Sequence, residues 1–494
     1  EADPYDANTF VVILEGDNPN QTISHLGISA NDAFLMTRAD GRLELFGEEQ
    51  LSWTQLGATA QAGAATIVLK EPVDWNVGDE IVIASTTYDM NQAETRRILQ
   101  VSAGGKRIGL DAPLRYSHFG ELQAYDDGQG TIYELDERAE VGLLSRNIKI
   151  QGDAEATIDG IGGNLMFMPS TGHVHIDGVE LYHMGQKARL ARYPVHWHLA
   201  GDREGDFVKN TSIHRSFNRA VTIHATHNVL VESTVAYDHI GHGYFLENAV
   251  ETGNKFYYNL GLVTREPQPG EELLPTDLGP KQFQISGPGT YWITNPDNIL
   301  VGNVAGGSQQ GSGFWYALPK GPLNESINDP QYARVNPQTT PLGVFADNRA
   351  HSNFIGLDVD GGPNRQTDVA QAAHNAPPRT ADFTRFTAFA NERNGVYFRG
   401  TSRIHLTDSR FGDKRLNVMF AFGQTGANQM TLEQAHAYDN SVVVKSGGGV
   451  DMSVPPQNHT VKAILIDETF DTGLPASWFQ IQYSGSNLWG WVPG

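Results

Sequence analysis

The sequence predicts an all-β protein in which a small β-domain precedes a parallel β-helix. Short runs of apolar and β-branched residues recur between glycine, asparagine and aspartate, as in "RLELFG", "DEIVIAS" and "HNVLVES", and such runs are typical of strands. The 494 residues include 53 glycines and 24 prolines, and no apolar stretch with helical spacing exceeds about three turns. Segments in the middle of the chain repeat at an interval in the low twenties, with asparagine near each corner, which indicates the coils of a parallel β-helix.

The pattern of strand-like runs and repeats divides the chain into three parts. Residues 1–140 contain strands of irregular length and predict a compact β-domain. Residues 141–455 carry the repeats and predict the β-helix, and residues 456–494 predict a C-terminal cap or the start of a further module. The clearest repeat aligns "SIHRSFNRAVTI" with "TVAYDHIGHGYF" at an offset of 22 residues, so that Ile213 matches Val235 and Ile223 matches Phe245.

Three insertions rich in proline and glycine interrupt the repeats. They are "REPQPGEELLPTDLGPKQ", "LPKGPLNESINDPQYARVNPQTTPLG" and "DGGPNRQTDVAQAAHNAPPRT". Long loops in a compact domain usually serve a function, and we expect these three to rise as walls beside a groove.

Composition excludes several classes of protein. A formal net charge of −22 disfavours nucleic acid as the main partner. The absence of cysteine excludes disulfides and thiolate metal sites, and no apolar run reaches the roughly 18 residues of a membrane span. We expect a secreted monomer whose signal peptide has been removed.

Histidines concentrate in one part of the predicted β-helix. Of the 17 in the chain, several lie in "PVHWHLA", "AVTIHAT" and "IGHGYFLEN". Because side chains alternate along a strand, we expect His196, His198, His224, His242 and Tyr244 to point outward from these three segments.

The inward residues fix how these outward side chains line up. Stacking Trp197 on Ile223 on Phe245 would place the outward side chains of the three segments over one another, at about 4.8 Å between coils. The sequence therefore predicts one histidine-rich patch roughly 10 Å wide.

This patch suits two kinds of chemistry. His196, His198 and His224 are the natural trio to hold a divalent metal ion, zinc or calcium. Alternatively, the imidazoles act as acid and base, with Tyr244 as proton donor or acceptor. Asp358, with Asp360 two residues further on, is an additional candidate acid or base of the glycosidase type.

Basic and aromatic residues nearby suggest an acidic polymer as substrate. Lys187, Arg192 and Arg215 flank the histidines, and arginine binds carboxylates in bidentate fashion. Trp315 is a candidate for stacking on a sugar ring, and Arg399 a further cationic contact.

The same segments carry a resemblance to a known family. "AEVGLLSRNIKIQGD", "RYPVHWHLAGD", "SIHRSFNRAVTIHATHNVLV" and "IGHGYFLE" resemble the vertebrate cell-migration-inducing hyaluronidase and its transmembrane relative. "WNVGDEIVIASTTYDMNQAETRRI" resembles their N-terminal domain, which is named for eight glycines. The resemblance spans about residues 40–420, and it implies a right-handed β-helix that depolymerises hyaluronan or a related glycosaminoglycan.

Motif-matched positions carry over from this resemblance residue by residue. They are His196, His198, His214, His224, His242 and Asp202, and we place Asp202 among the substrate-binding residues. The lack of cysteine, and of a large insertion after "LSWTQL", indicates a minimal bacterial version of the family.

The expected function is a secreted enzyme that hydrolyses an acidic polysaccharide within the chain. β-Elimination on a uronate polymer is one alternative, because histidine, tyrosine and arginine or a metal supply the base and the cation that it needs. A non-catalytic carbohydrate-binding or adhesion protein is another, in which the histidines form a polar ladder or a structural metal clip. A phage-like structural spike is disfavoured by the N-terminal domain.

Overall fold

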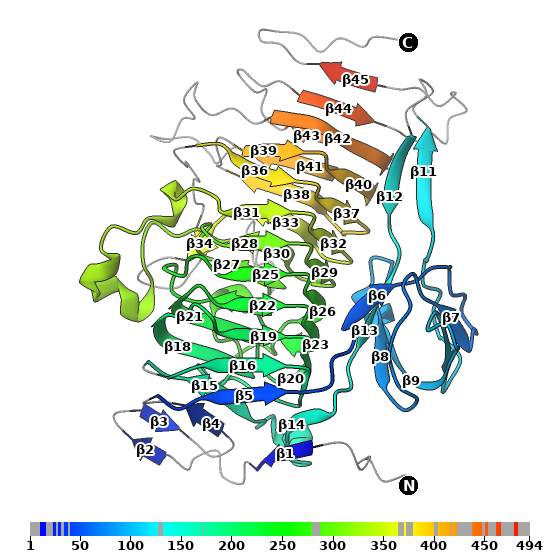
Figure 1. The fold of residues 1–494 in the computed structure, drawn as a ribbon. Coiled ribbons are helices and arrows are strands. Elements are labelled where there is room, and N and C mark those ends of the chain that lie inside the picture. Colours follow the sequence, from blue (N-terminus) through cyan, green and yellow to red (C-terminus); the bar gives the residue numbers. More distant parts are fainter. Residues whose placement is uncertain are drawn as a thin grey trace.

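The fold is seen in a computed structural model, shown in Figure 1. The structure describes residues 10–421 apart from 16–22, 26–27, 31–33, 38–39, 127–131, 170, 279–286, 364–369, 372–378, 400–403 and 415. Beyond residue 421 it describes the backbone of the last four strands only.

Successive coils of the chain stack into a parallel β-helix, each coil giving one strand to each of three columns. The first column consists of β5 (Leu43–Phe46), β16 (Val174–Asp177), β19 (Phe207–Lys209), β22 (Leu230–Glu232), β25 (Lys255–Tyr257), β28 (Ile299–Val301), β31 (Val344–Ala346), β36 (Ala381–Thr384) and β39 (Ile404–Thr407). The second consists of β1 (Phe10–Leu14), β14 (Ile148–Gly152), β17 (Val179–Tyr182), β20 (Ser212–Ser216), β23 (Val235–Ile240), β26 (Leu260–Arg265), β29 (Val304–Gly306), β32 (Arg349–His351), β37 (Thr387–Phe389) and β40 (Arg410–Lys414). The third consists of β4 (Phe34–Thr37), β15 (Asn164–Phe167), β18 (Val195–Asp202), β21 (Val221–His227), β24 (Tyr244–Leu246), β27 (Tyr291–Ile293), β30 (Ser312–Tyr316), β33 (Ile355–Val359), β38 (Asn394–Arg399), β41 (Leu416–Ala421) and β43 (Val450–Met452).

Three further strands lie at the C-terminal end. β42 (Ala437–Ser446) pairs with both β39 and β40, and β44 (Val461–Leu465) pairs with β42 and, antiparallel, with β45 (Phe479–Gln482). Apart from the backbone of β44 and β45, the predicted C-terminal part 456–494 lies outside the described residues.

A small antiparallel β-domain interrupts the β-helix between β5 and β14. Its sheet has the order β6 (Trp53–Gln55), β13 (Glu140–Leu143), β8 (Glu80–Ile83), β9 (Glu94–Val101), β10 (Arg107–Leu110), β7 (Thr66–Val68). A hairpin of β11 (Leu122–Asp126) and β12 (Ile132–Asp136) extends from it along the side of the β-helix (Figure 1). The prediction of a parallel β-helix with a small β-domain near its start is confirmed, although β1, β4 and β5, within the predicted 1–140 domain, pair with strands of the β-helix.

The remaining elements are short. They are the hairpins β2 (Ile23–His25) with β3 (Ile28–Ala30) and β34 (Gly362–Pro363) with β35 (Ala370–Gln371), the helix α1 (Ala156–Asp159), and the 3₁₀ turns η1 (Met90–Gln92), η2 (Pro275–Asp277), η3 (Asn324–Asn328), η4 (Pro330–Tyr332) and η5 (Pro337–Thr339). Within the described part of the chain, no helix is long and apolar enough to cross a membrane.

Asparagine ladders hold the coils together at the corners, as the sequence predicted. Asn303 Oδ1 accepts hydrogen bonds from the backbone N–H of Asn259 at 3.0 Å and from its side-chain amide at 2.9 Å. The amide of Asn303 in turn donates to Asn348 Oδ1 and to the carbonyl oxygen of Phe256. These amides satisfy buried backbone groups at the bends, where no ladder of strands can do so.

The predicted repeat offset of 22 residues is wrong by one residue. Ile213 pairs with Ala236, and Ile223 pairs with Leu246, so the offset is 23 here. The following coil is longer again, because Ala236 pairs with Gly261. Coil length varies because the corners absorb extra residues, whereas strand pairing tolerates none without turning side chains to the other face.

Charged side chains fasten the small domain to the second column. His351 Nε2 lies 3.0 Å from Glu140 Oε2 with both side chains fully buried, and Arg349 Nη2 lies 3.0 Å from Asp136 Oδ2. Burial would raise the pKa of Asp136, but the hydrogen bond from Arg138 and the charges of Arg349 and Arg138 outweigh it and hold the pKa below its ordinary value.

Replacing the ladder residue should destabilise the β-helix without changing its surface. In Asn303→Ala, buried groups of Asn259 and Phe256 lose their partner, and we expect the free energy of unfolding to fall by at least about 2 kcal/mol. Urea unfolding checks this, with the exposed Asn328→Ala as the matched control. Equal stability of the two variants would contradict the role given to the ladder.

The docking of the small domain should depend on pH through Asp136. Its carboxylate has a lowered folded-state pKa, so it stabilises the fold above its ordinary pKa of about 4 and loses that contribution as the pH falls. Asp136→Asn should lower the thermal midpoint at pH 7, by the loss of charged hydrogen bonds worth ~1.5–3 kcal/mol. The difference in thermal midpoint between this variant and wild type should narrow below about pH 4. If the difference stays constant down to pH 2, the role assigned to the Asp136 carboxylate is refuted.

Candidate metal centre

Three histidines meet on the outer face of the third column. β18 and β21 are parallel neighbours in a register that pairs His198 with His224 and Trp197 with Ile223. Trp197 and Ile223 are fully buried inside the coil, so the alternation of the strands turns His196, His198 and His224 outward. One ring nitrogen of each lies within 4.8 Å of the others.

The rings are packed closely and fixed in place. The ring centroids are 5.0 Å apart for His196 and His198, 4.9 Å for His198 and His224, and 5.8 Å for His196 and His224. His196 is fully buried, His224 is 3% exposed, and His198 is half-buried and the most accessible of the three. The structure thus brings together the trio that the sequence singled out for a metal.

Each ring has one buried nitrogen without a hydrogen-bond partner. His196 Nδ1 lies 3.2 Å from the carbonyl oxygen of Ala191, to which it donates, and this leaves the lone pair of Nε2 unpartnered. His224 Nε2 lies 3.2 Å from Glu325 Oε2, and Nδ1 is left without a hydrogen bond. His198 Nδ1 is also buried and unpartnered. Buried polar atoms in proteins are rarely left in this state.

Electrostatics keep two of the imidazoles neutral. Burial lowers the pKa of His196 well below its ordinary value. Burial and the neighbouring charges of His224 and Arg192 lower the pKa of His198 to about 4. For His224 burial acts in the same direction, but the carboxylates of Glu247 and Glu325 outweigh it and raise the pKa. Neutral imidazole is the form that binds metal ions.

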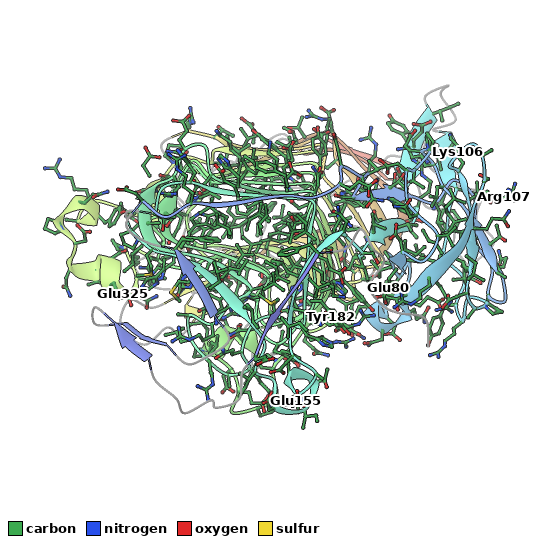
Figure 2. The ribbon with its side chains drawn as sticks, turned by 60° about the horizontal axis from the view of Figure 1, so that its bottom comes forward. Glu80, Lys106, Arg107, Glu155, Tyr182 and Glu325 are labelled. Carbon is green, nitrogen blue, oxygen red and sulfur yellow. The ribbon has the colours of Figure 1, made fainter. Side chains whose placement is uncertain are left out.

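Two carboxylates that the sequence reasoning did not identify complete the cluster. Glu247 Oε2 lies 3.5 Å from His224 Nδ1, with its side chain 7% exposed. Glu325 belongs to η3 in the insertion 318–343, projects at the side of the molecule remote from the small domain (Figure 2), and has a side chain that is 59% exposed. The hydrogen bond from His224 lowers the pKa of Glu325 to about 2, so it is a carboxylate at neutral pH.

The insertion 318–343 lies against this face, as a wall loop should. Besides Glu325 it contributes Tyr332, whose hydroxyl lies 3.0 Å from His227 Nε2. Asp202 sits beside this contact, because it pairs with His227 in the strand register and accepts a hydrogen bond from Asn228 at 2.8 Å. Asp202 is exposed at the edge of the cluster.

The prediction that Tyr244 faces outward is wrong. Since Ile223 pairs with Leu246, the residue that turns outward is Phe245, and Tyr244 turns into the core. Its hydroxyl is 2.6 Å from Thr234 Oγ1 and its ring stacks on Tyr291 at 4.6 Å. The single extra residue in this coil inverts the two faces of β24.

His242 does not join the trio. It is fully buried beneath residues 265–278, the described part of the first insertion. There Nε2 lies 3.0 Å from Thr276 Oγ1, and Nδ1 accepts a hydrogen bond from the Gly289 N–H. Its ring stacks on Trp292 at 4.0 Å, and burial lowers its pKa to about 3.

Asp358 lies on the same outward row as His196 but far along it. The register passes from His196 through Thr222, Phe245, Trp292 and Trp315 to Asp358. Five steps of about 4.8 Å separate its ends by about 24 Å, and Asp358 is fully buried, as is Asp360 nearby.

Trp315 is too deeply buried to stack on a sugar ring. Its ring is 1% exposed, contacts Trp292 edge-on at 4.8 Å, and its Nε1 donates to the Asp360 carbonyl at 2.7 Å. The prediction that it stacks on substrate is wrong, because the row that carries it is covered.

The predicted cations are dispersed. Arg215 binds Glu80 of the small domain at 2.6 Å, and His214 lies 3.0 Å from Glu180 in the second column, so neither reaches the trio. Lys187 pairs with Glu271 at 2.8 Å. Arg192 is half-buried beside His198. The side chain of Arg399 lies outside the described residues.

Comparison with known proteins points to one family. The sequence model of the CEMIP β-helix family matches residues 160–357, a range that includes the trio, Glu247 and Glu325. The chain is 36% identical over 415 residues to the human cell surface hyaluronidase CEMIP2, an alignment that covers 73% of this chain and 29% of that protein. It is 38% identical over 361 residues to mouse fibrocystin-L, covering 64% of this chain and 8% of that protein.

Among solved structures, the catalytic domain of a GH87 α-1,3-glucanase covers 85% of this chain and 88% of its own at 10% identity, with a TM-score of 0.33. That value is too low to support an argument about the site. The chain spans less than a third of the length of the two curated relatives named above. On the sequence match, the β-helix of this chain, with its histidine cluster, belongs to the CEMIP-like family.

Proposed function

We propose that the chain is an extracellular enzyme that cuts an acidic polysaccharide, hyaluronan or a related glycosaminoglycan, by hydrolysis within the polymer. The observation that carries this proposal is the convergence, on the outer face of the third column, of three buried imidazole nitrogens that make no hydrogen bond. The names of relatives, which include cell surface hyaluronidases from human and zebrafish, support the substrate class and the location.

The residues present fit a divalent metal ion. His196 Nε2, His198 Nδ1 and His224 Nδ1 are the nitrogens left available, and three histidines are a donor set that zinc takes in catalytic sites with a position left open. An ion bound there would act as a Lewis acid, stabilising negative charge that develops during hydrolysis.

Second-sphere contacts set the tautomers that such a site needs. The Ala191 carbonyl holds the proton of His196 on Nδ1, and the Glu325 carboxylate holds the proton of His224 on Nε2. In metal sites this kind of acceptor orients the ligand ring and raises its basicity. We assign Glu325 this positioning role. Glu247 Oε2 lies 3.5 Å from His224 Nδ1, the nitrogen of that ring that would bind the metal.

Arg192 is the cation best placed to attract a uronate. It is half-buried and close enough to His198 for its charge to lower the pKa of that ring. A guanidinium binds a carboxylate in bidentate fashion, and this contact would hold an acidic sugar next to the accessible member of the trio.

Hydrolysis is the reaction that this arrangement favours over elimination. The tyrosine that elimination would use as base, Tyr244, faces the core and is 1% exposed. Hydrolysis yields fragments without the unsaturated uronate whose absorbance marks a lyase.

Metal binding should depend on the three histidines of the trio. We expect the metal-free protein to bind one equivalent of Zn²⁺ by isothermal titration, and His198→Ala to weaken that binding at least 100-fold, because one of three ligands is lost. His175→Ala, a histidine of the first column stacked on Phe207, is the control and should bind as wild type does. Equal Zn²⁺ affinity of the two variants would show that the trio is no metal site.

Activity should follow the metal. Incubated with hyaluronan, the wild-type protein should produce shorter chains on a sizing gel, without the ultraviolet absorbance of an unsaturated uronate. A chelator should stop the cleavage until Zn²⁺ is restored. Glu325→Ala should lower the rate by about 10–100-fold through its effect on His224. If neither hyaluronan nor any other uronate polymer is shortened while wild type still binds it, the protein is a binding module and the proposal fails.

A further inference from the structure

The corner between the first and second columns is built from a row of residues in left-handed backbone conformation. In each coil the residue at this corner has φ between +45° and +69°, and several donate their N–H to a carbonyl of the next coil. The row consists of Gly178, Asn210, Ser233, Tyr258, Gly302, Asp347, Arg385 and Asp408. Most are glycine, asparagine, aspartate or serine, and glycine, asparagine and aspartate are the types that adopt this conformation most readily.

Tyr258 departs from that pattern. A bulky aromatic residue at φ +53° is unfavourable, and strained residues of this kind cluster at functional sites. Arg385, the other large residue of the row, forms an ion pair with Asp347 at 2.6 Å. Tyr258 has no charge with which to form such an ion pair, and the residue is 52% exposed.

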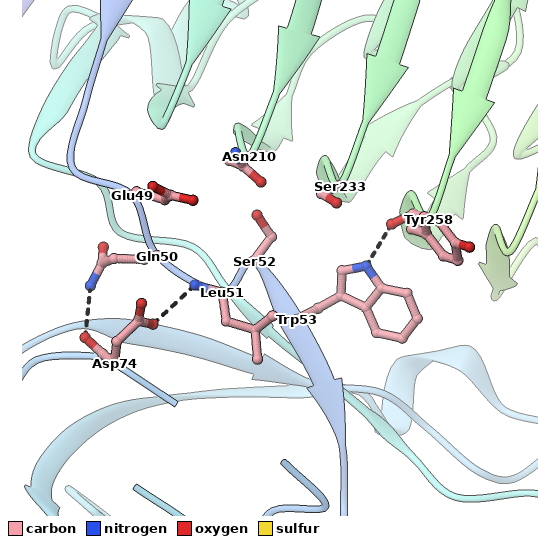
Figure 3. A pocket seen from close by; sticks show the side chains of 9 residues that line it. All are labelled: Glu49, Gln50, Leu51, Ser52, Trp53, Asp74, Asn210, Ser233 and Tyr258. Atoms are coloured by element: carbon pink, nitrogen blue, oxygen red, sulfur yellow. Dashed lines mark hydrogen bonds between the residues drawn. The ribbon is translucent and has the colours of Figure 1, made fainter. Parts of the chain in front are cut away.

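The ring of Tyr258 is nevertheless held in place. It packs on Gly302, where a Cβ would lie 2.4 Å from Cδ1 of the ring. Its carbonyl oxygen accepts a hydrogen bond from Trp53 Nε1 of the small domain at 2.6 Å. The result is a fixed, solvent-facing aromatic surface beside the indole of Trp53 (Figure 3).

This surface forms one wall of a groove between the small domain and the β-helix. The groove has a volume of ≈ 650 Å³, within the ~300–1,000 Å³ typical of small-ligand sites. Its lining, drawn in Figure 3, is Glu49, Gln50, Leu51, Ser52, Trp53, Asp74, Asn210, Ser233 and Tyr258. The groove lies beside the small domain, whereas Glu325 (Figure 2) and the strands β18 and β21, which carry the histidine cluster (Figure 1), lie on the opposite side of the β-helix.

The chemistry of the lining identifies the class of ligand. Among the described residues that line the groove there is no lysine, arginine or histidine, while Glu49 and Asp74 are acidic, so an anionic sugar would be repelled. Aromatic rings offer a flat apolar face, and carboxylates, amides and hydroxyls accept and donate hydrogen bonds to neutral hydroxyl groups. A pyranose ring presents both kinds of surface.

We propose that this groove is a non-catalytic binding site for an uncharged saccharide, which stacks on Tyr258 and bonds through its hydroxyl groups to Glu49 and Asn210. The site is separate from the histidine cluster and does not depend on the function proposed for it. It would let the protein hold a neutral glycan on one side while the opposite side stays free.

Titration with neutral and acidic oligosaccharides of equal length tests the proposal. The probes are chitotetraose and cellotetraose against a hyaluronan tetrasaccharide, with binding to the 494-residue chain followed by isothermal titration. We expect at least one neutral probe to bind, His198→Ala to bind it equally well, and Tyr258→Asn to weaken it at least tenfold. Tyr257→Ala, a tyrosine outside the groove, is the control.

Tyr258→Asn also separates binding from folding. Asparagine suits the left-handed conformation better than tyrosine, so the variant should melt at the same temperature as wild type or higher while losing the saccharide. The proposal is overturned if no neutral probe binds, if Tyr258→Asn binds as wild type does, if His198→Ala abolishes binding, or if the acidic probe binds more tightly through Tyr258.

Discussion

The register between neighbouring coils determines both the core and the surfaces of this β-helix. Because side chains alternate, each pairing of one strand with the next decides at once which residues fill the core and which share a surface. The pairing of His198 with His224 brings two imidazoles together and, through the same alternation, adds His196. In the next coil the pairing of Ile223 with Leu246 sends Tyr244 inward and Phe245 outward. The one extra residue in this coil is therefore the reason why the histidine cluster stops here and aromatic side chains occupy the rest of the outward row.

That aromatic surface explains why the cluster is confined to two coils. Phe245, Trp292 and Trp315 continue the outward row, and Leu274 of the described segment 265–278 packs on them. Arg219 is held over Phe245 and ion-paired with Asp277 of the same insertion. The neighbouring insertion 318–343 instead lies beside the histidines and supplies Glu325. The first insertion therefore buries its part of the outer face of the third column, whereas the insertion 318–343 adds functional groups to that face.

The fold and the trio could be predicted from the sequence because both follow from local alternation. "PVHWHLA" and "AVTIHAT" each place an apolar residue at the centre and histidine beside it, so no knowledge of distant pairing is needed to turn the rings outward. Tyr244 and His242 could not be placed, because their orientation depends on coil length, which is set at corners and not by a strict repeat. The distance of Asp358 from His196 could not be predicted for a related reason, since the number of coils between the two residues is hidden by long insertions.

Residues whose partners are remote in sequence were beyond such reasoning. The sequence suggested that Arg215 binds substrate, but Arg215 forms an ion pair at 2.6 Å with Glu80 of the small domain. Glu325 lies 101 residues after His224 within a loop whose path no periodicity reveals. Glu247 follows Phe245 by two residues, and a correct register would have pointed to it as the next outward group over His224.

If the three buried imidazole nitrogens form a metal site, X-ray absorption at the zinc edge should detect them in protein loaded with one equivalent of Zn²⁺. We expect three imidazole nitrogens at about 2.0–2.1 Å from the metal. A spectrum with oxygen ligands alone, and without the outer-shell scattering of imidazole, would contradict it.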